Sequence, residues 1–329
     1  MRAMGIRAFG CADRIEPLSL EIPTPGEGEV LVRLTRSGVN FIDVYMRTGV
    51  YQRSDTYKTP LPMVLGMEGA GVVETVGKGV CRMKPGDRVA FSLTRGSYAD
   101  YICVPAWKVA IVPRDISDDI AASLMLQGAT AHYLTHSAYP VKEGDRCLVH
   151  AAAGGVGQLL VQLAKARGAE VFATVGSPEK AEIAKARGAD HIIFYRHEDF
   201  RRHIMEATGG EGVSVAYDSV GKDTIARSIR SLKRRGTCVL FGASSGVVEA
   251  VEPLELAEAG SVFLTRPHLA DYMASGEEIS WRVSDLFKLV QSGHLHVTID
   301  RSWPLDKACD AHRALETRTS RGKLLLKIS

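Results

Sequence analysis

The chain has 329 residues, of which 45% are hydrophobic and 24% are charged, and its formal net charge is +3. This length is sufficient to bury a large core and predicts two domains. Because the basic excess is so slight, composition gives no reason to expect a nucleic-acid-binding protein. No uncharged stretch is long and apolar enough to predict a membrane span.

The cysteines and the N-terminus indicate the cellular compartment. Six cysteines are scattered along the chain without a C-x-x-C pair, which favours reduced thiols over a disulfide framework. The first residues, MRAMGIRAFG, lack the long apolar segment of a signal peptide. We therefore expect a cytoplasmic protein.

The first 120 or so residues are predicted to be rich in β-structure. Alternating apolar residues predict strands at Val30–Leu34, Gly69–Val76 and Arg88–Phe91. Between them, Gly38–Tyr51 is rich in aromatic and amide side chains and has the i, i+4 spacing of a helix. Ser117–Tyr139 is also predicted to be helical, with its serine as N-cap and acids in the first turn. We place a domain boundary inside this last segment.

A glycine-rich segment follows and organises the rest of the chain. The apolar run Cys147–Val149 leads into Gly154–Gly157, a predicted helix over Gln158–Arg167 and a second apolar run at Glu170–Val175. This order of strand, turn, helix and strand is typical of a unit that binds a pyrophosphate on backbone N–H groups. Ala152 occupies the first glycine position of G-x-G-x-x-G, so a tight turn in an unrelated α/β protein is the alternative.

The next units repeat one phrase. Lys165–Glu170 and Lys185–Asp190 are nearly identical, and Ser231–Gly236 is a third example. Each predicts basic residues in a last helical turn, a glycine directly after the helix, and then a strand. With Val213–Tyr217 and Val262–Thr265 the chain has six apolar strands alternating with helices. This pattern predicts a doubly wound, six-stranded parallel sheet.

The alternation stops in the C-terminal part of the chain. Amphipathic helices are predicted at Glu277–Ser292 and Lys307–Leu315, and a closing strand at Lys323–Ile328. We expect this tail to return to the first domain and make it discontinuous. The predicted domains are residues 1–122 with 270–329, and residues 123–269.

The residues after the second strand of the glycine-rich unit predict the cofactor. A carboxylate that binds the ribose of NAD is expected about 20 residues beyond the glycines, but Gly176 and Ser177 are found there. Lys180 lies in the first turn of the next helix, where a cation is unfavourable unless an anion is bound. The 2′-phosphate of NADP(H) would be such an anion. The alternatives are that Ser177 only caps this helix and that Lys180 is a solvated surface charge. The missing acid also counts against S-adenosylmethionine, whose ribose likewise needs a carboxylate.

Five separated phrases together resemble one known family. They are VNFIDVYMRTGVY (Val39–Tyr51), GMEGAGVV (Gly66–Val73), HAAAGGVG (His150–Gly157), YDSVG (Tyr217–Gly221) and FGASSG (Phe241–Gly246). In this order they are similar to the zinc-free quinone oxidoreductases, relatives of zeta-crystallin in the medium-chain dehydrogenase/reductase superfamily. The resemblance implies an α/β protein with a β-rich GroES-like catalytic domain and a Rossmann domain inserted before the C-terminal segment. It also implies NADPH as donor, a small-molecule quinone as acceptor, and a homodimer formed through the Rossmann domains.

The residues also predict that no metal is bound. Zinc-dependent members of the superfamily have a histidine where this chain has Met67, and a thioether is a poor zinc ligand. No cysteine lies near Asn40 to act as a second ligand, and the clustered cysteines of a structural zinc site are missing. His132 and His136 are four residues apart, but on a segment expected to pack in the core.

Without a metal, the acceptor must itself stabilise the charge that it receives. An ordinary ketone would become an alkoxide, which needs a Lewis acid or a proton donor. A quinone becomes a delocalised phenolate, so positioning alone could supply much of the rate. We expect the quinone to stack on the nicotinamide in a cleft between the domains. Tyr45 and Tyr51 are the candidate proton donors, with water and simple aromatic packing as alternatives, and hydride and single-electron transfer both stay open.

The resemblance also implies which residues contact the cofactor, from one end of NADPH to the other. The expected contacts are Asn40, Tyr45, Thr130 and Tyr133 at the nicotinamide half; Gly154, Gly155 and Val156 at the pyrophosphate; Gly176, Ser177, Lys180 and Tyr195 around the 2′-phosphate; Gly242, Ser244 and Ser245 at the edge of the sheet; and Leu269 and Arg318 as the last contacts.

Two other functions remain open at this point. The same fold and cofactor permit an NADPH-dependent enone or alkene reductase. A low-turnover NADPH-binding protein with a structural or RNA-binding role is the other alternative, although no basic and aromatic strip stands out beyond the cofactor site. We expect a small-molecule partner, with neither nucleic acid nor membrane, and the sequence does not select one quinone.

Overall fold

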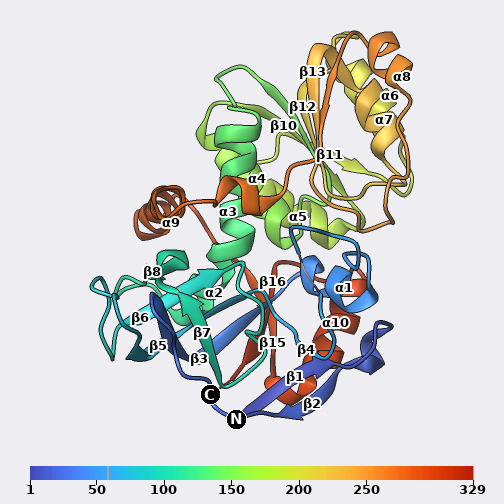
Figure 1. Cartoon of the computed structure of the whole chain (residues 1–329). Coiled ribbons are helices and arrows are strands. Elements are labelled where there is room, and N and C mark those ends of the chain that lie inside the picture. Colours follow the sequence, from blue (N-terminus) through green and yellow to red (C-terminus); the bar gives the residue numbers. More distant parts are fainter. Residues whose placement is uncertain (58, 329) are drawn as a thin grey trace. The chain divides into compact units, whose positions relative to one another are not determined.

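The computed structural model describes residues 1–57 and 59–328 (Figure 1). These residues form two compact units, each with its own sheet structure and core. Unit 1 consists of residues 1–129, 273–293 and 297–328, and unit 2 of residues 130–272 and 294–296.

Unit 1 is built on a seven-stranded sheet of order β15-β16-β3-β5-β6-β8, with β7 paired to β3. Its pairings are antiparallel except for β15 with β16, which is parallel. The strands are β3 (Glu29–Val39), β5 (Glu68–Val76), β6 (Arg88–Ser92), β7 (Tyr101–Pro105), β8 (Val109–Ile111), β15 (Ile299–Pro304) and β16 (Lys323–Lys327). A smaller antiparallel sheet contains β1 (Arg2–Ile6), β2 (Glu16–Ser19) and β4 (Met63–Val64). The β-rich first part and its closing C-terminal strand are therefore confirmed.

Helices cover these sheets and tie distant segments of unit 1 together. They are α1 (Phe41–Thr48), α2 (Asp118–Ser123), α9 (Gly276–Gln291) and α10 (Ala308–Glu316), with short turns η1 (Ala12–Arg14), η2 (Ala106–Lys108) and η6 (Leu305–Lys307). Figure 1 shows α1 beside α10, and the Arg47–Glu316 ion pair joins them. The predicted tail helices are thus confirmed.

The helix predicted over Ser117–Tyr139 is confirmed in extent but not in form. Ser117 caps α2, because its hydroxyl accepts a hydrogen bond from the Ile120 N–H. The segment then passes through two π-helical turns on either side of a short α-helix. These elements are η3 (Leu124–Gly128), α3 (Ala129–Tyr133) and η4 (Leu134–Ala138).

Unit 2 contains the predicted doubly wound parallel sheet, with strand order β11-β10-β9-β12-β13-β14. The strands are β9 (Arg146–Val149), β10 (Glu170–Val175), β11 (His191–Phe194), β12 (Val213–Asp218), β13 (Leu232–Leu240) and β14 (Phe263–Thr265). Its helices are α4 (Gly155–Ala166), α5 (Pro178–Ala186), α6 (Phe200–Ala207), α7 (Ile225–Arg230) and α8 (Pro253–Glu258), followed by η5 (Leu269–Tyr272). Figure 1 shows α4 and α5 on one side of this sheet and α6, α7 and α8 on the other. The strand order reverses between β9 and β12, which is the position where such sheets bind ligands.

Two local predictions in unit 2 need correction. The helix expected from Gln158 begins three residues earlier, so the glycines themselves form the first turn of α4. The third basic phrase does not end a helix at Gly236: α7 ends at Arg230, and the phrase forms a register shift in β13 with Arg235 at a φ of 59°. Gly236 is needed instead for a close approach, since a Cβ there would lie 2.9 Å from the Lys233 carbonyl oxygen.

Candidate functional site

The glycine-rich turn of unit 2 has the geometry of an anion site. Gly154 is the N-cap of α4 and has no side chain to satisfy the first turn. Its own N–H donates to the Ala151 carbonyl at 2.8 Å. A Cβ on Gly157 would lie 2.3 Å from that same oxygen, so the glycine allows the helix to press against the turn. The glycines therefore leave the first turn of α4 uncovered by side chains, while the Gly154 N–H itself is bonded within the turn. The phosphate contacts of Gly154, Gly155 and Val156 stay a prediction.

The residues predicted around the 2′-phosphate lie together after β10 and β11. Tyr195 covers Gly176, because a Cβ on that glycine would be 3.0 Å from the phenol oxygen. Ser177 caps α5, and its hydroxyl accepts the Lys180 N–H at 3.4 Å. This cap was one of the alternatives, and it places the Lys180 side chain in the first helical turn. The cluster contains cationic and hydroxyl groups where an NAD-binding site would need a carboxylate.

A third predicted segment, after β13, packs on the loop after β12. The Ser244 N–H donates to the Ser219 carbonyl at 3.2 Å, and the Ser245 N–H to the Val220 carbonyl at 2.9 Å. A Cβ on Gly242 would lie 2.4 Å from the Ser219 oxygen, so only glycine permits this contact. The two loops form one layer at the carboxyl edge of the sheet.

The predicted residues before and after the parallel sheet also lie in unit 2. Thr130 and Leu269 are buried. Tyr133 stacks on Tyr272 with ring centroids 4.4 Å apart and an interplanar angle of 12°. Because Leu269 and Tyr272 bound the same short turn η5, this stack fixes that turn against α3.

In unit 1, Asn40 is engaged by a buried ion pair that sequence analysis did not find. Lys323 Nζ lies 2.5 Å from Glu68 Oε2 and donates to Asn40 Oδ1 at 2.8 Å. The Asn40 amide nitrogen donates in turn to Glu68 Oε2 at 2.9 Å, and the other Glu68 oxygen accepts the Leu126 N–H at 2.6 Å. The three side chains are buried. The orientation of the Asn40 amide is therefore set by Lys323 and Glu68.

A hydrogen-bonded chain continues from this cluster along α1. Asp43 Oδ2 accepts the Asn40 N–H at 2.8 Å and the Tyr98 hydroxyl at 3.3 Å. That hydroxyl is 3.0 Å from His312 Nε2, and His312 Nδ1 is 3.3 Å from an Arg47 nitrogen. Since the guanidinium can only donate, His312 Nδ1 accepts and its Nε2–H donates to Tyr98.

Burial shifts the titration of this chain. It raises the pKa of Asp43 to about 7, with the Asn40 N–H and the Lys323 charge acting in the opposite direction. Burial, with the neighbouring Arg47 charge, lowers the pKa of His312 to about 3. The pKa of Tyr98 is raised by burial and by the Asp43 carboxyl. At neutral pH His312 is thus a neutral donor, while Asp43 is near its titration midpoint.

The two candidate proton donors belong to an aromatic cluster at the end of α1. Tyr45 and Tyr51 meet edge to face with ring centroids 5.6 Å apart. The ring centroids of Tyr51 and Tyr57 are 5.1 Å apart, and those of Phe41 and Tyr45 are 6.0 Å apart. Aromatic packing, the alternative to a catalytic role, is therefore present at both tyrosines. Arg318, the last predicted contact, is exposed beyond the end of α10 at a φ of 56°.

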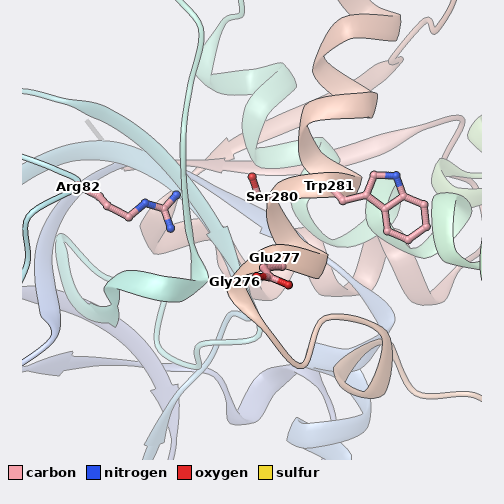
Figure 2. A pocket seen from close by; sticks show the side chains of 5 residues that line it. All are labelled: Arg82, Gly276, Glu277, Ser280 and Trp281. Carbon is pink, nitrogen blue, oxygen red and sulfur yellow. The ribbon is translucent and has the colours of Figure 1, made fainter.

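Two further features of unit 1 bear on ligand binding, the residue at the zinc position and a surface hollow. Met67 is buried where a histidine ligand would be needed, and residues 1–57 and 59–328 contain no group of three or more His, Cys, Asp or Glu side chains that could hold a metal ion. An open hollow of about 540 Å³ lies in unit 1 beside α9. Figure 2 shows its lining by Arg82, Gly276, Glu277, Ser280 and Trp281. No predicted cofactor residue lines it.

Comparisons with known proteins agree with this architecture. Residues 26–114 match the family described as alcohol dehydrogenase GroES-like domain, and residues 155–287 match the family described as zinc-binding dehydrogenase. Quinone oxidoreductase 1 of Escherichia coli is 43% identical over 92% of each chain, and the 2-haloacrylate reductase of a Burkholderia species is 42% identical over 93% of each. The solved structure of the Escherichia coli quinone oxidoreductase complexed with NADPH superimposes with a TM-score of 0.96 at 40% identity, covering both chains completely.

A GroES-like part and a doubly wound sheet with an uncapped glycine turn define a dehydrogenase or reductase of the medium-chain superfamily. Within that class the similarity extends over more than nine-tenths of the chain. The chain belongs to the quinone oxidoreductase family.

Proposed function

We propose that this protein is an NADPH:quinone oxidoreductase. The observation that carries the proposal is the cluster of Gly176, Ser177, Lys180 and Tyr195, in which glycine and serine, not a carboxylate, directly follow β10. The nearest acid, Glu179, lies beyond Pro178 in α5. The relatives support it, since the solved Escherichia coli structure is a complex with NADPH.

The residues present fit this cofactor along its length. The backbone of the glycine-rich turn, with the N–H groups of Gly155 and Val156 beside Gly154, would hold the pyrophosphate, and Ser177 with Lys180 the 2′-phosphate. Bound NADPH would supply reducing equivalents to the quinone, as a hydride or as single electrons. The fit rests on a turn that only small residues allow, as the 2.3 Å approach at Gly157 demonstrates.

The chain's own part in catalysis is to position groups and to deliver a proton. Asn40 is held by Lys323 and Glu68, so its amide presents a fixed face at the start of α1. Tyr45 and Tyr51 place hydroxyl groups on the neighbouring aromatic cluster. Because a quinone leaves a weakly basic phenolate, either hydroxyl or water suffices as the proton source.

One relative favours a second candidate activity, reduction of an activated alkene. The Burkholderia relative is named 2-haloacrylate reductase, and a haloacrylate has a C=C bond conjugated to a carboxylate. A protein with the same cofactor site could deliver hydride to such a bond.

Steady-state kinetics separate these functions. kcat/KM for NADPH and NADH is measured with 1,4-benzoquinone, phenanthrenequinone, 2-cyclohexenone and a 2-alkenal on metal-free enzyme. We expect NADPH to be preferred and the quinones to be the better acceptors. Preference for the alkenes would support the second activity, and tight NADPH binding without turnover would indicate a binding protein.

The 2′-phosphate assignment has a test of its own. Lys180→Ala should raise the KM for NADPH by about tenfold and leave that for NADH unchanged, since only NADPH has the paired phosphate. Lys185→Ala, on the last turn of the same helix and paired with Glu182, is the control. Equal effects on both cofactors would contradict the assignment.

We also propose that unit 2 forms a homodimer through the β14 edge. β14 is the last strand of the sheet order, and its Phe263 side chain is 62% exposed. Two further apolar side chains of unit 2 are exposed, Leu254 of α8 by 60% and Val247 after β13 by 53%. An apolar strand edge of this kind is expected to be covered by another chain. Phe263→Asp should shift the protein to monomer in light scattering after size-exclusion chromatography. Ile22→Asp, at a side chain of unit 1 that is 52% exposed and outside any strand, should not.

The cysteines support action in the reducing cytoplasm. All six are free thiols, and burial raises the pKa of the Cys147 and Cys238 thiols in the parallel sheet. Over residues 1–57 and 59–328 no helix combines the length and apolarity needed to cross a membrane.

A further inference from the structure

A buried cluster centred on His150 lies beneath the glycine-rich turn of unit 2. The His150 Nδ1 atom is 3.0 Å from the Thr174 hydroxyl, and its Nε2 atom is 2.9 Å from the Ser228 hydroxyl. Ser228 donates to Asp218 Oδ2 at 2.7 Å, and the Ala151 N–H donates to the Thr174 hydroxyl at 3.3 Å. Four side chains of the cluster are buried, namely His150, Thr174, Asp218 and Ser228.

Counting protons fixes the direction of each bond. Ser228 has one hydroxyl hydrogen and gives it to the Asp218 carboxylate, so it must accept from His150 Nε2–H. Burial lowers the pKa of His150, with the Asp218 charge acting in the opposite direction and the Arg227 charge in the same one. A neutral imidazole with Nε2–H has an accepting Nδ1, and Thr174 therefore donates to it. The result is one unbroken relay from the Ala151 N–H to the Asp218 carboxylate.

The relay ends on the strained residue of the turn. Ala151 has a φ of 51°, a left-handed conformation that costs a residue with a side chain free energy. Its N–H is held by Thr174, and its carbonyl accepts the Gly154 N–H. The backbone that presents Gly154 and the first turn of α4 is thus held in place from below.

The other end of the relay reaches the remaining cofactor segments. Asp218 Oδ1 accepts the N–H groups of Val220 and Gly221 at 2.9 Å each. The loop ordered in this way provides the carbonyls that hold Ser244 and Ser245. The glycine-rich turn and the segment after β13 therefore share one buried polar cluster.

We propose that His150 is a positioning residue for the dinucleotide pyrophosphate, acting through Thr174, Ser228 and Asp218 to hold Ala151 and the glycine-rich turn. The proposal rests on the proposed function, because it takes that turn as the pyrophosphate site. If it is correct, breaking the relay weakens binding of the pyrophosphate and leaves binding of the adenosine 2′-phosphate unchanged.

Thr174→Val tests this, because it removes the hydroxyl at nearly constant volume. Its dissociation constants for NADPH and for adenosine 2′-monophosphate are measured by calorimetry on the full chain. We expect the NADPH constant to rise about tenfold, as the Ala151 N–H loses its acceptor. The 2′-monophosphate constant should change less than about twofold, since that ligand has no pyrophosphate.

Three further variants separate positioning from general loosening. Thr174→Ser should restore NADPH binding, and Ser228→Ala should weaken it, though less than Thr174→Val. Ser214→Ala serves as control. It removes a buried hydroxyl that accepts the backbone N–H of Arg146 at the amino ends of the strands, away from the glycine-rich turn. Adding Ala151→Gly to Thr174→Val should recover at least part of the lost affinity, because glycine adopts a positive φ without support.

The outcomes distinguish this proposal from the proposed function. An unchanged NADPH constant in Thr174→Val, or an equal loss for adenosine 2′-monophosphate, would overturn the relay. A wild-type preference for NADH would refute the proposed cofactor but leave the same comparison to be made with NADH. A wild-type protein that binds neither dinucleotide would overturn both.

Discussion

The two units stabilise their buried polar side chains in different ways. In unit 2, the buried Asp218 carboxylate accepts hydrogen bonds from two backbone N–H groups and two hydroxyls. In unit 1, the buried cluster contains the Lys323–Glu68 ion pair and the carboxyl of Asp43. Within this unit 1 cluster, Asp43 Oδ1 and Arg47 Nε are buried without a hydrogen-bond partner.

This difference predicts how each unit responds to change. A carboxylate with several neutral donors keeps most of its stabilisation when one donor is lost. A buried ion pair loses its only charge compensation when one partner is removed, and an incompletely bonded carboxyl changes protonation instead. Unit 1 should therefore be more sensitive than unit 2 to the loss of a single partner, and Asp43 should add a pH dependence of its own.

The largest effect is expected at the ion pair. Lys323→Met removes the buried cation that is paired with Glu68 and should lower the free energy of unfolding by about 3–5 kcal/mol. Urea unfolding followed by circular dichroism measures the change. Lys327→Met, at the exposed end of the same strand, is the matched control and should cost less than about 0.5 kcal/mol.

A double variant tests whether the loss is due to the unpaired charge. Lys323→Met combined with Glu68→Leu should be more stable than Lys323→Met alone, because no charge remains buried. If Lys323→Met were no worse than Lys327→Met, the buried pair would not distinguish the two units.

The next effect is a pH dependence that originates at Asp43. Its pKa is about 7 in the folded chain, compared with about 3.9 when unfolded. Between these values the folded state holds the proton and the unfolded state does not, so this group stabilises the fold fully below about pH 4 and loses that contribution as the pH rises towards 7. As the pH rises from about 4 to about 7, the free energy of unfolding of Asp43→Asn should therefore increase by roughly 2–4 kcal/mol relative to that of the wild type.

Unfolding at several pH values checks this difference. His312, with a pKa of about 3, acts with the opposite sign, since its stabilisation is lost as pH falls from about 6.5 towards 3. It is present in both proteins, so subtracting the wild-type curve from the Asp43→Asn curve isolates the carboxyl. A difference that is constant from pH 4 to pH 7 would refute the raised pKa.

Much of the fold was predictable because it depends on local patterns. The glycine turns at Gly168 and Gly188 adopt the positive φ that was expected of residues ending a helix. The phrase at Ser231–Gly236 shares their composition but not their structure, because in β13 it pairs with β12 and forms a register shift. The residue types alone predict a turn rich in basic side chains. Whether that turn ends a helix or lies within a strand depends on pairing with a neighbouring strand.

The candidate site was predictable only where its residues lie in one phrase. Gly154 and Gly157 are neighbours in the sequence, and their role follows from their spacing. Lys323 and Glu68 are 255 residues apart, so no local pattern connects them. The available signal was Glu68 itself, a glutamate directly before the predicted strand Gly69–Val76. His150 and Asp218 both lie in segments that resemble the family. Their hydrogen-bonded connection forms only when the sheet brings the ends of β9, β10 and β12 together.

The smallest effect is expected in unit 2, at Thr224. Its hydroxyl donates to Asp218 Oδ1 at 2.8 Å, and Thr224→Val removes this bond while three other donors to the carboxylate remain. The loss should be about 1 kcal/mol in urea unfolding, the usual contribution of one hydrogen bond. Thr317→Val, at an exposed threonine after α10, is the control, with an expected change below about 0.5 kcal/mol. A loss as large as that of Lys323→Met would mean that the Asp218 cluster is as vulnerable as the ion pair, and the contrast between the two interiors would not hold.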